Sequence, residues 1–465
     1  MKPSHHTTAD PVGTTQLPLG RWLMGLQQLH QRLRPYFARP EPYQHSLLYL
    51  QAVLSEIPRK NGWQIAEHAG KDRPYGMQRL LSRACWDQEG VRDELRELAA
   101  RTLSPPPLAP ESPASNPPFP VLVIDESGFP KRGDHSAGVG VQHCGRTGEV
   151  ENCQVGVFLS YVTEQGHALI DRELYLPEDW CADLPRRFAA HIPEHVTFQT
   201  KPELARRMIQ RAQEAHLPIR WVVADTVYGH SPTLRTFLEA QSYASVLAVP
   251  STEVVCVQTR AGPLLRDVGS IAETLTRVRD WQRLSQSQGT KGERLFDWAL
   301  LPWLQAGSVD GRHFLLIRRC LDPPEQLAHY LVFAPAATPL LTIVQAIGAR
   351  WHIEEDLQVC KHLGLDQYEV RSFLGWYRHV TLVLLAAAFL VNLCVQQKQA
   401  DLTRPPASRD PPRIALTSRE LHRLLARLLF PVKSSLPLVE RWLAFRQTHQ
   451  YWAGYYHRRR RAKAG

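Results

Sequence analysis

The sequence predicts an α/β protein whose core is a mixed sheet with helices on its faces, and the order of strand-like and helical stretches supports this prediction. Three strand-like stretches come first: 121–124, 136–143 and 154–162. Helix and strand then alternate: helix 202–216, strand 219–224, helix 231–240 and strand 244–249. Short apolar runs bounded by turns are typical of buried strands, and alternation with helices is typical of parallel strands.

A helical segment is predicted ahead of the sheet. The chain opens as a loose arm followed by a short amphipathic helix at 19–33. Apolar residues between 43 and 57 recur close to the 3.6-residue helical period, and Asn61 is a good N-cap for a second helix. A third helix is predicted from Tyr75 to Trp86.

The second and third of these helices, joined by a turn that contains Gly70 and Pro74, resemble a helix-turn-helix. Arg79 and Arg83 lie four residues apart, so they share one face of the third helix and could contact DNA phosphates there. A three-helix bundle with solvated arginines fits the same pattern equally well.

Two linkers and a change of pattern after residue 250 divide the chain. The proline-rich stretch 104–120 cannot join a helix or a central strand, and 402–413 is a second linker rich in proline and arginine. The basic run that ends the chain at 455–463 is expected to be a flexible tail that binds polyphosphate.

The predicted segments are a flexible arm with a short helix (1–40), a helical DNA-binding domain (41–103), a proline-rich linker (104–120), the first part of the sheet core (121–250), a β-rich insertion (251–335), the second part of the core with a glutamate-bearing helix (336–400), and a basic helical segment with a tail (401–465).

Composition points to a cytoplasmic protein with a polyanionic partner. The formal net charge is +10 at pH 7, which favours nucleic acid. The eight cysteines form no CxxC pair and have no pair of histidines nearby, which speaks against a zinc site and favours reduced thiols. The N-terminus lacks the apolar core of a signal peptide.

Several other classes of protein are disfavoured. The most apolar run, 381–395, contains Asn392 and is shorter than the ~20 residues that cross a bilayer, so a buried core helix is expected and no membrane partner. The chain has no P-loop, and 138–143 begins like GxGxxG but ends in histidine, so no nucleotide cofactor is expected. Ser127 does not lie in the GxSxG pattern of hydrolases.

Two of the predicted buried strands end in an aspartate. Asp125 follows the apolar run 120–124, and Asp225 follows 220–224. If the two strands are neighbours, both carboxylates lie at one edge of the sheet, where they could hold a pair of hard cations for phosphodiester chemistry. Each aspartate alone could instead simply cap a turn.

A third acid is predicted on a basic helix. The residues of its core-facing stripe are Ile353, Leu357, Cys360 and Gly364. Glu354 falls at the edge of that stripe beside Arg350 and Lys361, Glu355 points to the solvated face, and Asp356 on the other edge is a rival. A surface ion pair between Arg350 and Glu354 is the alternative.

Together these residues resemble DDE transposases of bacterial insertion sequences, which belong to the RNase H-like, retroviral-integrase superfamily. The resemblance runs from about Val121 to Arg378, and 124–131, 224–229 and 350–361 carry its most specific motifs. One branch of the family has Tyr, two residues, Arg, three residues, Glu, six residues and Lys. Arg350, Glu354 and Lys361 fit that spacing, whereas Ile347 takes the place of the tyrosine.

The resemblance implies an RNase H-like mixed sheet with flanking helices, a helical N-terminal domain, and a β-rich insertion before the glutamate, consistent with the 354 − 225 = 129 residues between Asp225 and Glu354. It implies a Mg²⁺-dependent endonuclease and phosphoryl transferase in which Asp125, Asp225 and Glu354 hold two Mg²⁺ ions, with Mn²⁺ as a substitute. The residues expected to contact phosphates or DNA are Arg350, Lys361, Lys131, Arg79 and Arg83.

The implied partners are double-stranded DNA, as inverted-repeat ends and as target, and a second copy of the chain on that DNA. The protein would be associated with the nucleoid when bound. In relatives a tryptophan of the insertion can stabilise a flipped base; Trp281, Trp298 and Trp303 are candidates, with core packing as the alternative for each. Two other functions remain open: a catalytically silent DNA-binding protein descended from a transposase, and an RNase H-like nuclease without strand transfer.

Overall fold

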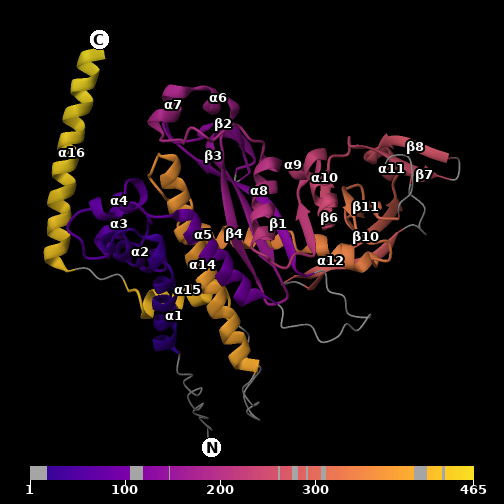
Figure 1. The fold of residues 1–465 in the computed structure, drawn as a ribbon, viewed down its shortest axis with the longest axis horizontal. Helices are drawn as coiled ribbons and strands as arrows, with labels where there is room; N and C mark the ends of the chain where they lie inside the picture. Colours follow the sequence, from indigo (N-terminus) through magenta and orange to yellow (C-terminus); the bar gives the residue numbers. More distant parts are fainter. Residues whose placement is uncertain are drawn as a thin grey trace, which may run out of the picture.

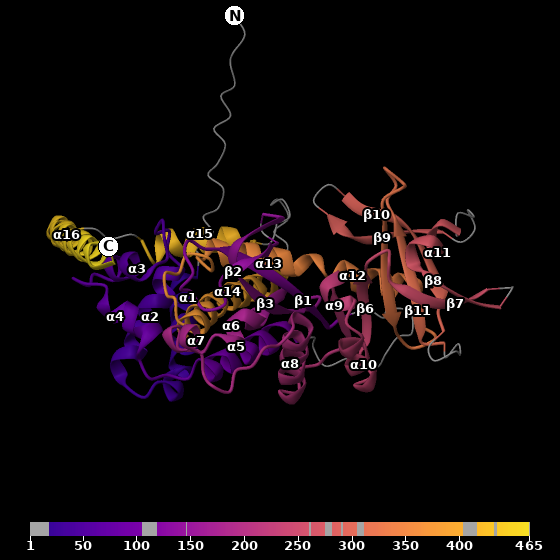
Figure 2. The same cartoon turned by 90° about the horizontal axis from the view of Figure 1, so that it is seen from above.

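The computed structural model describes residues 18–104, 119–145, 147–259, 262–274, 281–289, 292–304, 311–402, 416–431 and 435–464. The helices before the sheet are α1 (Leu19–Arg32), the 3-10 helix η1 (Arg34–Tyr36), α2 (Pro40–Val53), α3 (Gly62–His68), α4 (Tyr75–Ser82) and α5 (Gln88–Leu103). They form one end of an elongated molecule, the central sheet follows, and a β-rich region forms the other end (Figures 1 and 2). The side chain of Asn61 caps α3 by accepting hydrogen bonds from the backbone N–H groups of Trp63 and Gln64, as its residue type predicted.

The central sheet has the predicted RNase H-like topology. Its elements are β1 (Val121–Pro130), β2 (Gly140–Cys144), β3 (Glu149–Val162), β4 (His167–Tyr175), α6 (Glu178–Ala182), α7 (Leu184–Ala189), α8 (Lys201–Glu214), β5 (Trp221–Ala224), α9 (Thr226–Gly229), α10 (Pro232–Ala240) and β6 (Ala244–Val249). β3 pairs antiparallel with β4 and with β1, and β5 and β6 continue the sheet parallel to β1. The predicted mixed sheet is confirmed.

One core strand, β4, was missed by the sequence prediction. The middle of this strand is Asp171-Arg172-Glu173, which interrupts the apolar pattern, yet all three side chains are buried. They are buried because other elements supply partners: Arg92 on α5 and Arg211 on α8 contact Asp171, and Arg172 pairs with Glu89. Buried charges with such partners do not show in hydrophobic periodicity.

The predicted β-rich insertion extends the main sheet. Its elements are β7 (Val254–Thr259), β8 (Gly262–Asp267), α11 (Val268–Thr274), β9 (Gln282–Gly289), β10 (Gly292–Pro302), β11 (His313–Arg319) and β12 (Leu327–Phe333). β12 pairs antiparallel with β6, so β12, β11, β10 and β9 continue the sheet edge to edge, while β7 and β8 form a separate hairpin. The insertion and the core therefore share hydrogen bonds as well as side-chain packing.

Alternate residues of β1 face two different layers. Val121 and Val123 join the large core that also contains the N-terminal helices and α14, whereas Leu122 and Ile124 join the core beneath α8 and α10. The helices after the insertion are α12 (Leu340–Gly348), α13 (Trp351–His362), α14 (Phe373–Leu402), α15 (Ser418–Leu428) and α16 (Leu436–Ala464). The N-terminal helices and the sheet thus share one continuous core.

The predicted core helix at 381–395 is part of α14, which is twice as long. α14 is long and apolar enough to cross a membrane by length and composition, but 78% of its most apolar window is buried inside the protein. α5 and β4 pack against it. It is therefore the central helix of the fold, as the sequence predicted.

The C-terminal segment differs from the predicted flexible tail. α16 continues to Ala464 as one helix, drawn in yellow in Figure 1, and it starts by packing on α3. Trp442 is fully buried, contacts the ring of Trp63, and donates a hydrogen bond from its indole N–H to the carbonyl of Lys71. The basic run is thus presented on a helix anchored at its other end.

Candidate active site

The strand register brings Asp125 and Asp225 together. β1 and β5 are parallel neighbours whose last paired residues are Ile124 and Ala224, so Asp125 and Asp225 lie side by side where this pairing stops. β5 ends at Ala224 as predicted, whereas β1 continues along β3 to Pro130, so Asp125 lies within its strand and not at the strand's end. Asp225 also caps α9, because its carboxylate accepts a hydrogen bond from the backbone N–H of Val227 at 3.0 Å. Asp225 therefore caps a turn and also lies beside Asp125, so the first role does not exclude the second.

Gly229 fixes the position of α9 beside this edge. A Cβ at this position would lie 1.9 Å from the carbonyl oxygen of Ala248 on β6. Only glycine allows this close approach of the short helix to the strand. Gly229 thus lets α9 pack closely on β6, and this packing positions Asp225 at the start of α9.

A third acid, Glu126, joins the two aspartates. One carboxylate oxygen from each of Asp125, Glu126 and Asp225 lies within 4.8 Å of the others. Glu126 accepts hydrogen bonds from Lys201 at 2.6 Å and from the hydroxyl of Tyr228 at 2.8 Å. The sequence analysis missed Glu126, because consecutive strand residues are expected to point to opposite faces; its place next to Asp125 was the only available signal.

Burial and mutual repulsion set the charge of this cluster. Burial raises the pKa of Asp125 to about 7; the Arg350 guanidinium opposes this rise, and the charge of Asp225 adds to it. The pKa of Asp225 is raised by burial and by Glu126, against Arg350. Arg350 Nη2 lies 3.7 Å from Asp125 Oδ2, so one guanidinium faces several carboxylates. The cluster has an excess of negative charge that a cation would relieve.

Glu354 lies on the same cavity as Asp225 and outside the 4.8 Å cluster. A cavity of about 400 Å³ is lined by Asp225 from the end of β5, by Arg350 at the start of α13 and by Glu354 one turn later. Gly348, just before α13, also lines it. The sheet edge and the helix predicted to carry the third acid therefore border one common space.

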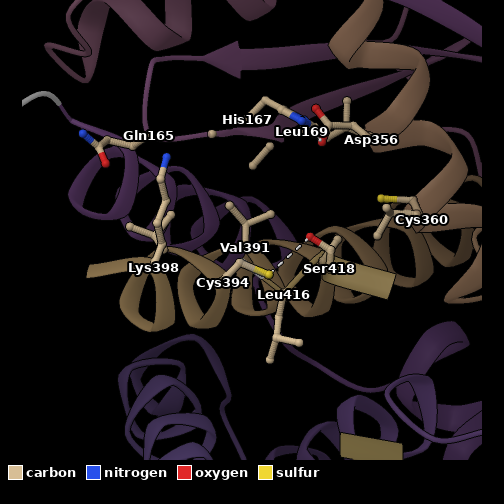
Figure 3. A pocket seen from close by; sticks show the side chains of 15 residues that line it. Gln165, His167, Leu169, Asp356, Cys360, Val391, Cys394, Lys398, Leu416 and Ser418 are labelled. Carbon is tan, nitrogen blue, oxygen red and sulfur yellow. Dashed lines mark hydrogen bonds and ion pairs between the residues drawn. The ribbon is translucent and has the colours of Figure 1, made fainter. Parts of the chain in front are cut away.

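The neighbouring acids of α13 have other contacts. Asp356 is buried, accepts a hydrogen bond from Ser160 Oγ, and lies 2.8 Å from His167 Nδ1. It lines a separate cavity of about 200 Å³ between β4, α13 and α14, where Figure 3 shows it next to His167 and opposite Cys394. Glu355, predicted to point to solvent, is half-exposed and contacts His352 at 2.9 Å.

The other predicted phosphate-binding residues lie elsewhere. Lys131 is packed on the ring of Tyr368, with its Nζ 3.6 Å from the ring centre, and burial lowers its pKa to about 8. Lys361 lies in the last turn of α13 and does not line the cavity. Arg79 and Arg83 are exposed, on α4 and at its C-terminal end. Of the five, the structure brings only Arg350 to the acids.

The cavity has further residues that the sequence analysis did not identify. Arg294 of β10, Arg318 of β11 and Trp351 of α13 line it, and the Arg294 guanidinium lies 4.7 Å from the Trp351 ring centre. Long-range strand pairing brings Arg294 and Arg318 here, so no local pattern could have indicated them; Trp351 directly follows the predicted Arg350. Of the three candidate tryptophans, Trp298 is fully buried, and Trp281 and Trp303 pack on the small core of the insertion.

The acids suit a hard divalent cation. Their donor atoms are all carboxylate oxygens, they lie close enough for a common ion, and they carry uncompensated charge. Mg²⁺ prefers oxygen ligands, needs few carboxylates and retains several waters. Cations held here would face a groove that Arg294, Arg318 and Arg350 make attractive to phosphates.

The chain is similar to known proteins in sequence and in fold. A probable transposase for insertion sequence element IS701 from Microchaete diplosiphon is 27% identical over 178 residues, which are 38% of this chain and 41% of that protein, so less than half of the relative's length is matched. The solved structure of a piggyBac transposase synaptic complex with hairpin DNA aligns with a TM-score of 0.42 and 11% identity, over 92% of this chain and 81% of that one. The family described as DDE superfamily endonuclease matches residues 32–292, more than half of the 465 residues. The chain belongs to the DDE superfamily of endonucleases.

Proposed function

We propose that this protein is a transposase that cleaves the DNA ends of its own mobile element and joins them to target DNA. The observation that carries the proposal is the meeting of Asp125 and Asp225 where the pairing of the parallel strands β1 and β5 stops, with Glu354 on the cavity that Asp225 lines. The family match includes both aspartates but ends before Glu354, so the role of Glu354 rests on its position. The similarity to an insertion-sequence transposase supports the substrate.

In this proposal Asp125, Asp225 and Glu354 hold two Mg²⁺ ions, which Mn²⁺ can replace. When bound, the ions stabilise negative charge on the attacking and leaving oxygens of the phosphodiester. Arg350, Arg294 and Arg318 orient the DNA backbone in the cavity by charge-assisted hydrogen bonds. Glu126, already bound to Lys201 and Tyr228, keeps the edge of the sheet in place.

The decisive experiment is cleavage of linear DNA that carries the inverted repeats flanking the gene, with Mg²⁺ present. Asp125→Ala, Asp225→Ala and Glu354→Ala should each reduce cleavage by at least about 10³-fold while end binding survives, because metal-bound charge stabilisation is lost. The matched control is Asp134→Asn, an exposed acid after β1 that should cleave normally. Normal cleavage by Glu354→Ala, together with loss in a folded Asp356→Ala variant, would make Asp356 the third acid.

The same assay separates the alternatives. A nuclease without strand transfer would cut these ends but never join a 3′ end to a plasmid target. A catalytically silent DNA-binding protein would bind the DNA ends but would not cut them in Mg²⁺ or Mn²⁺. Two copies of the chain per pair of ends, measured by the mass of the complex in solution, are expected because two ends must be held together.

The basic end of α16 is proposed to bind DNA backbone. Residues 458–463 contain five cations, and the Arg458 and Arg459 side chains are exposed. Deleting 458–463 should weaken binding to all DNA sequences alike and reduce the slope of log affinity against log salt by up to about 4, since each phosphate contact contributes ~0.9. An unchanged slope in a fluorescence titration would contradict the proposal. Arg79→Gln with Arg83→Gln tests α4 in the same way.

A further inference from the structure

A second cluster of metal-ligating side chains lies on the opposite side of α13 from Glu354. His167 of β4, His352 and Glu355 each offer one ligand atom, and these three atoms all lie within 4.8 Å of one another. The two imidazole rings are stacked with centroids 4.4 Å apart. The cluster is separate from Asp125, Glu126 and Asp225, which offer only oxygen ligands and form a different group.

The spacing of the donor atoms matches a tetrahedral metal ion. His167 Nε2 lies 3.4 Å from Glu355 Oε2, and His352 Nδ1 lies 2.9 Å from the same oxygen. Metal–ligand bonds of about 2.0–2.1 Å in a tetrahedron place neighbouring donor atoms roughly 3.3 Å apart. The third pair, His167 Nε2 and His352 Nδ1, lies within 4.8 Å, and the two stacked rings would turn so that both nitrogens point at one ion.

The surroundings of His167 orient it as a ligand. Its Nδ1 lies 2.8 Å from the buried carboxylate of Asp356, and Ser160 Oγ donates a hydrogen bond to that carboxylate. A carboxylate only accepts hydrogen bonds, so Nδ1 carries the proton and Nε2 is directed at Glu355. A carboxylate behind a ligating histidine is the usual second layer of a metal site, because it fixes the ring and raises the basicity of the donor nitrogen.

Two hydrogen-bond acceptor atoms 3.4 Å apart repel each other unless a proton or a metal ion lies between them. Nε2 of a neutral His167 and Oε2 of Glu355 are both acceptors, so either a proton or a metal ion bridges them. The side chains of His167, His352 and Glu355 are 26%, 36% and 45% exposed, which leaves a path for an ion from solvent. Two nitrogens and one oxygen favour Zn²⁺ over Mg²⁺, and a fourth position would remain for water.

We propose that His167, His352 and Glu355 form a Zn²⁺ site that fastens α13 to β4. Spacing along the sequence predicted no zinc site, because His167 lies 352 − 167 = 185 residues before His352 and only the fold brings them together. α13 also carries Arg350 and Glu354, so an ion here would hold that helix against the sheet. The proposal does not depend on the transposase function.

The test uses full-length protein with Asp125→Asn and Asp225→Asn, which removes the other cation site, after treatment with a chelator. Titration with Zn²⁺ alone by calorimetry should show one site and raise the melting temperature. His352→Ala and Glu355→Gln, both at half-exposed positions, should each weaken Zn²⁺ binding by at least about 100-fold, and Asp356→Asn by about 10–100-fold as a residue behind the ligand. His143→Ala, at an exposed histidine on β2, should leave the affinity unchanged.

Co²⁺ provides an independent readout. Its visible absorption should show nitrogen ligation in the parent protein and lose it in His352→Ala. Zn²⁺ affinities of His352→Ala and Glu355→Gln within threefold of the parent would overturn the proposal and leave a proton-bridged cluster in its place. Because the parent lacks Asp125 and Asp225, this outcome is independent of whether the protein cleaves DNA.

Discussion

The acids around Asp171 and the acids around Asp125 lie in the same sheet and differ in the cations around them. Asp171 on β4 is surrounded by three guanidiniums, with Arg211 Nε at 2.9 Å and Arg92 Nη1 at 3.4 Å. Asp125 on β1 faces two other acids and has one guanidinium, that of Arg350, at 3.7 Å. Burial is common to both, so the number of matched cations separates a structural group from a group that is available to a metal ion.

The pKa values of the two aspartates move in opposite directions for this reason. Burial alone would raise the pKa of Asp171, but Arg211, Arg92 and Arg172 together hold it well below its ordinary value. Burial raises the pKa of Asp125, and Arg350 is not enough to prevent it. The ion pairs around Asp171 therefore stabilise β4 in the fold. The excess negative charge around Asp125 destabilises the fold until a cation binds there.

The largest effect on stability is expected from Asp171→Asn. The variant leaves Arg92 and Arg211 buried near a neutral amide, and removing one partner of a buried ion pair costs about 3–5 kcal/mol. Urea denaturation at pH 7 measures the loss in the free energy of unfolding. Asp134→Asn, an exposed acid, should change this free energy by less than about 0.5 kcal/mol. A loss below about 1 kcal/mol for Asp171→Asn would show that the packing of Arg92 and Arg211 against β4 does not need the charge of Asp171.

The difference between the paired charges of β4 and the acids around Asp125 also explains which features could be predicted from the sequence. Asp125 and Asp225 were predictable as neighbours, because each follows an apolar run and the two runs pair as parallel strands. The continuation of β1 beyond Asp125 to Pro130 was not predicted, because it depends on pairing with β3. β4 was missed because Asp171, Arg172 and Glu173 look like a solvated turn until α5 and α8 supply their partners. Local patterns report burial only when the buried residues are apolar.

Other differences between sequence and structure have the same origin in long-range contacts. The pairing of β12 with β6, which makes the insertion part of the sheet, has no local signal. Nor does the cavity shared by Glu354 and Arg294, which needs the strands of the insertion beside α13. The start of α16 is anchored by Trp442 against Trp63, nearly 400 residues earlier in the chain.

In the metal-free protein, the contribution of Asp125 to stability should fall as the pH rises through the range in which Asp125 ionises. Its ordinary value is 3.8 and its pKa in the fold is about 7, so the folded state holds the proton more tightly. The stabilising effect of that proton is present below about pH 4 and is lost by about pH 7, a loss of up to about 4 kcal/mol. Asp225, Glu126 and Arg350 are the charged groups that face it.

Asp125→Asn removes this dependence. In chelator, the variant should unfold at nearly the same temperature as the parent at about pH 4, where Asp125 is protonated in the fold, and at a clearly higher temperature at pH 8. Saturating Mg²⁺ at pH 8 should raise the melting temperature of the parent and leave that of the variant nearly unchanged, because the ion binds the ionised cluster. An equal difference between parent and variant at both pH values would mean that Asp125 is already ionised in the fold at pH 4.

The smallest effect is expected from an exposed ion pair on the same helix that carries Arg92. Arg101 Nη1 lies 2.6 Å from Glu97 Oε1 on α5, with side chains 43% and 53% exposed, whereas the Arg92 side chain is 6% exposed. Arg101→Gln should reduce the free energy of unfolding by at most about 0.5 kcal/mol, and 1 M NaCl should abolish the difference, because water and salt screen exposed charges. If Arg101→Gln cost as much as Asp171→Asn in the same urea titration, the distance between charges alone would set the stability. Burial would then not distinguish the ion pairs of β4 from those at the surface.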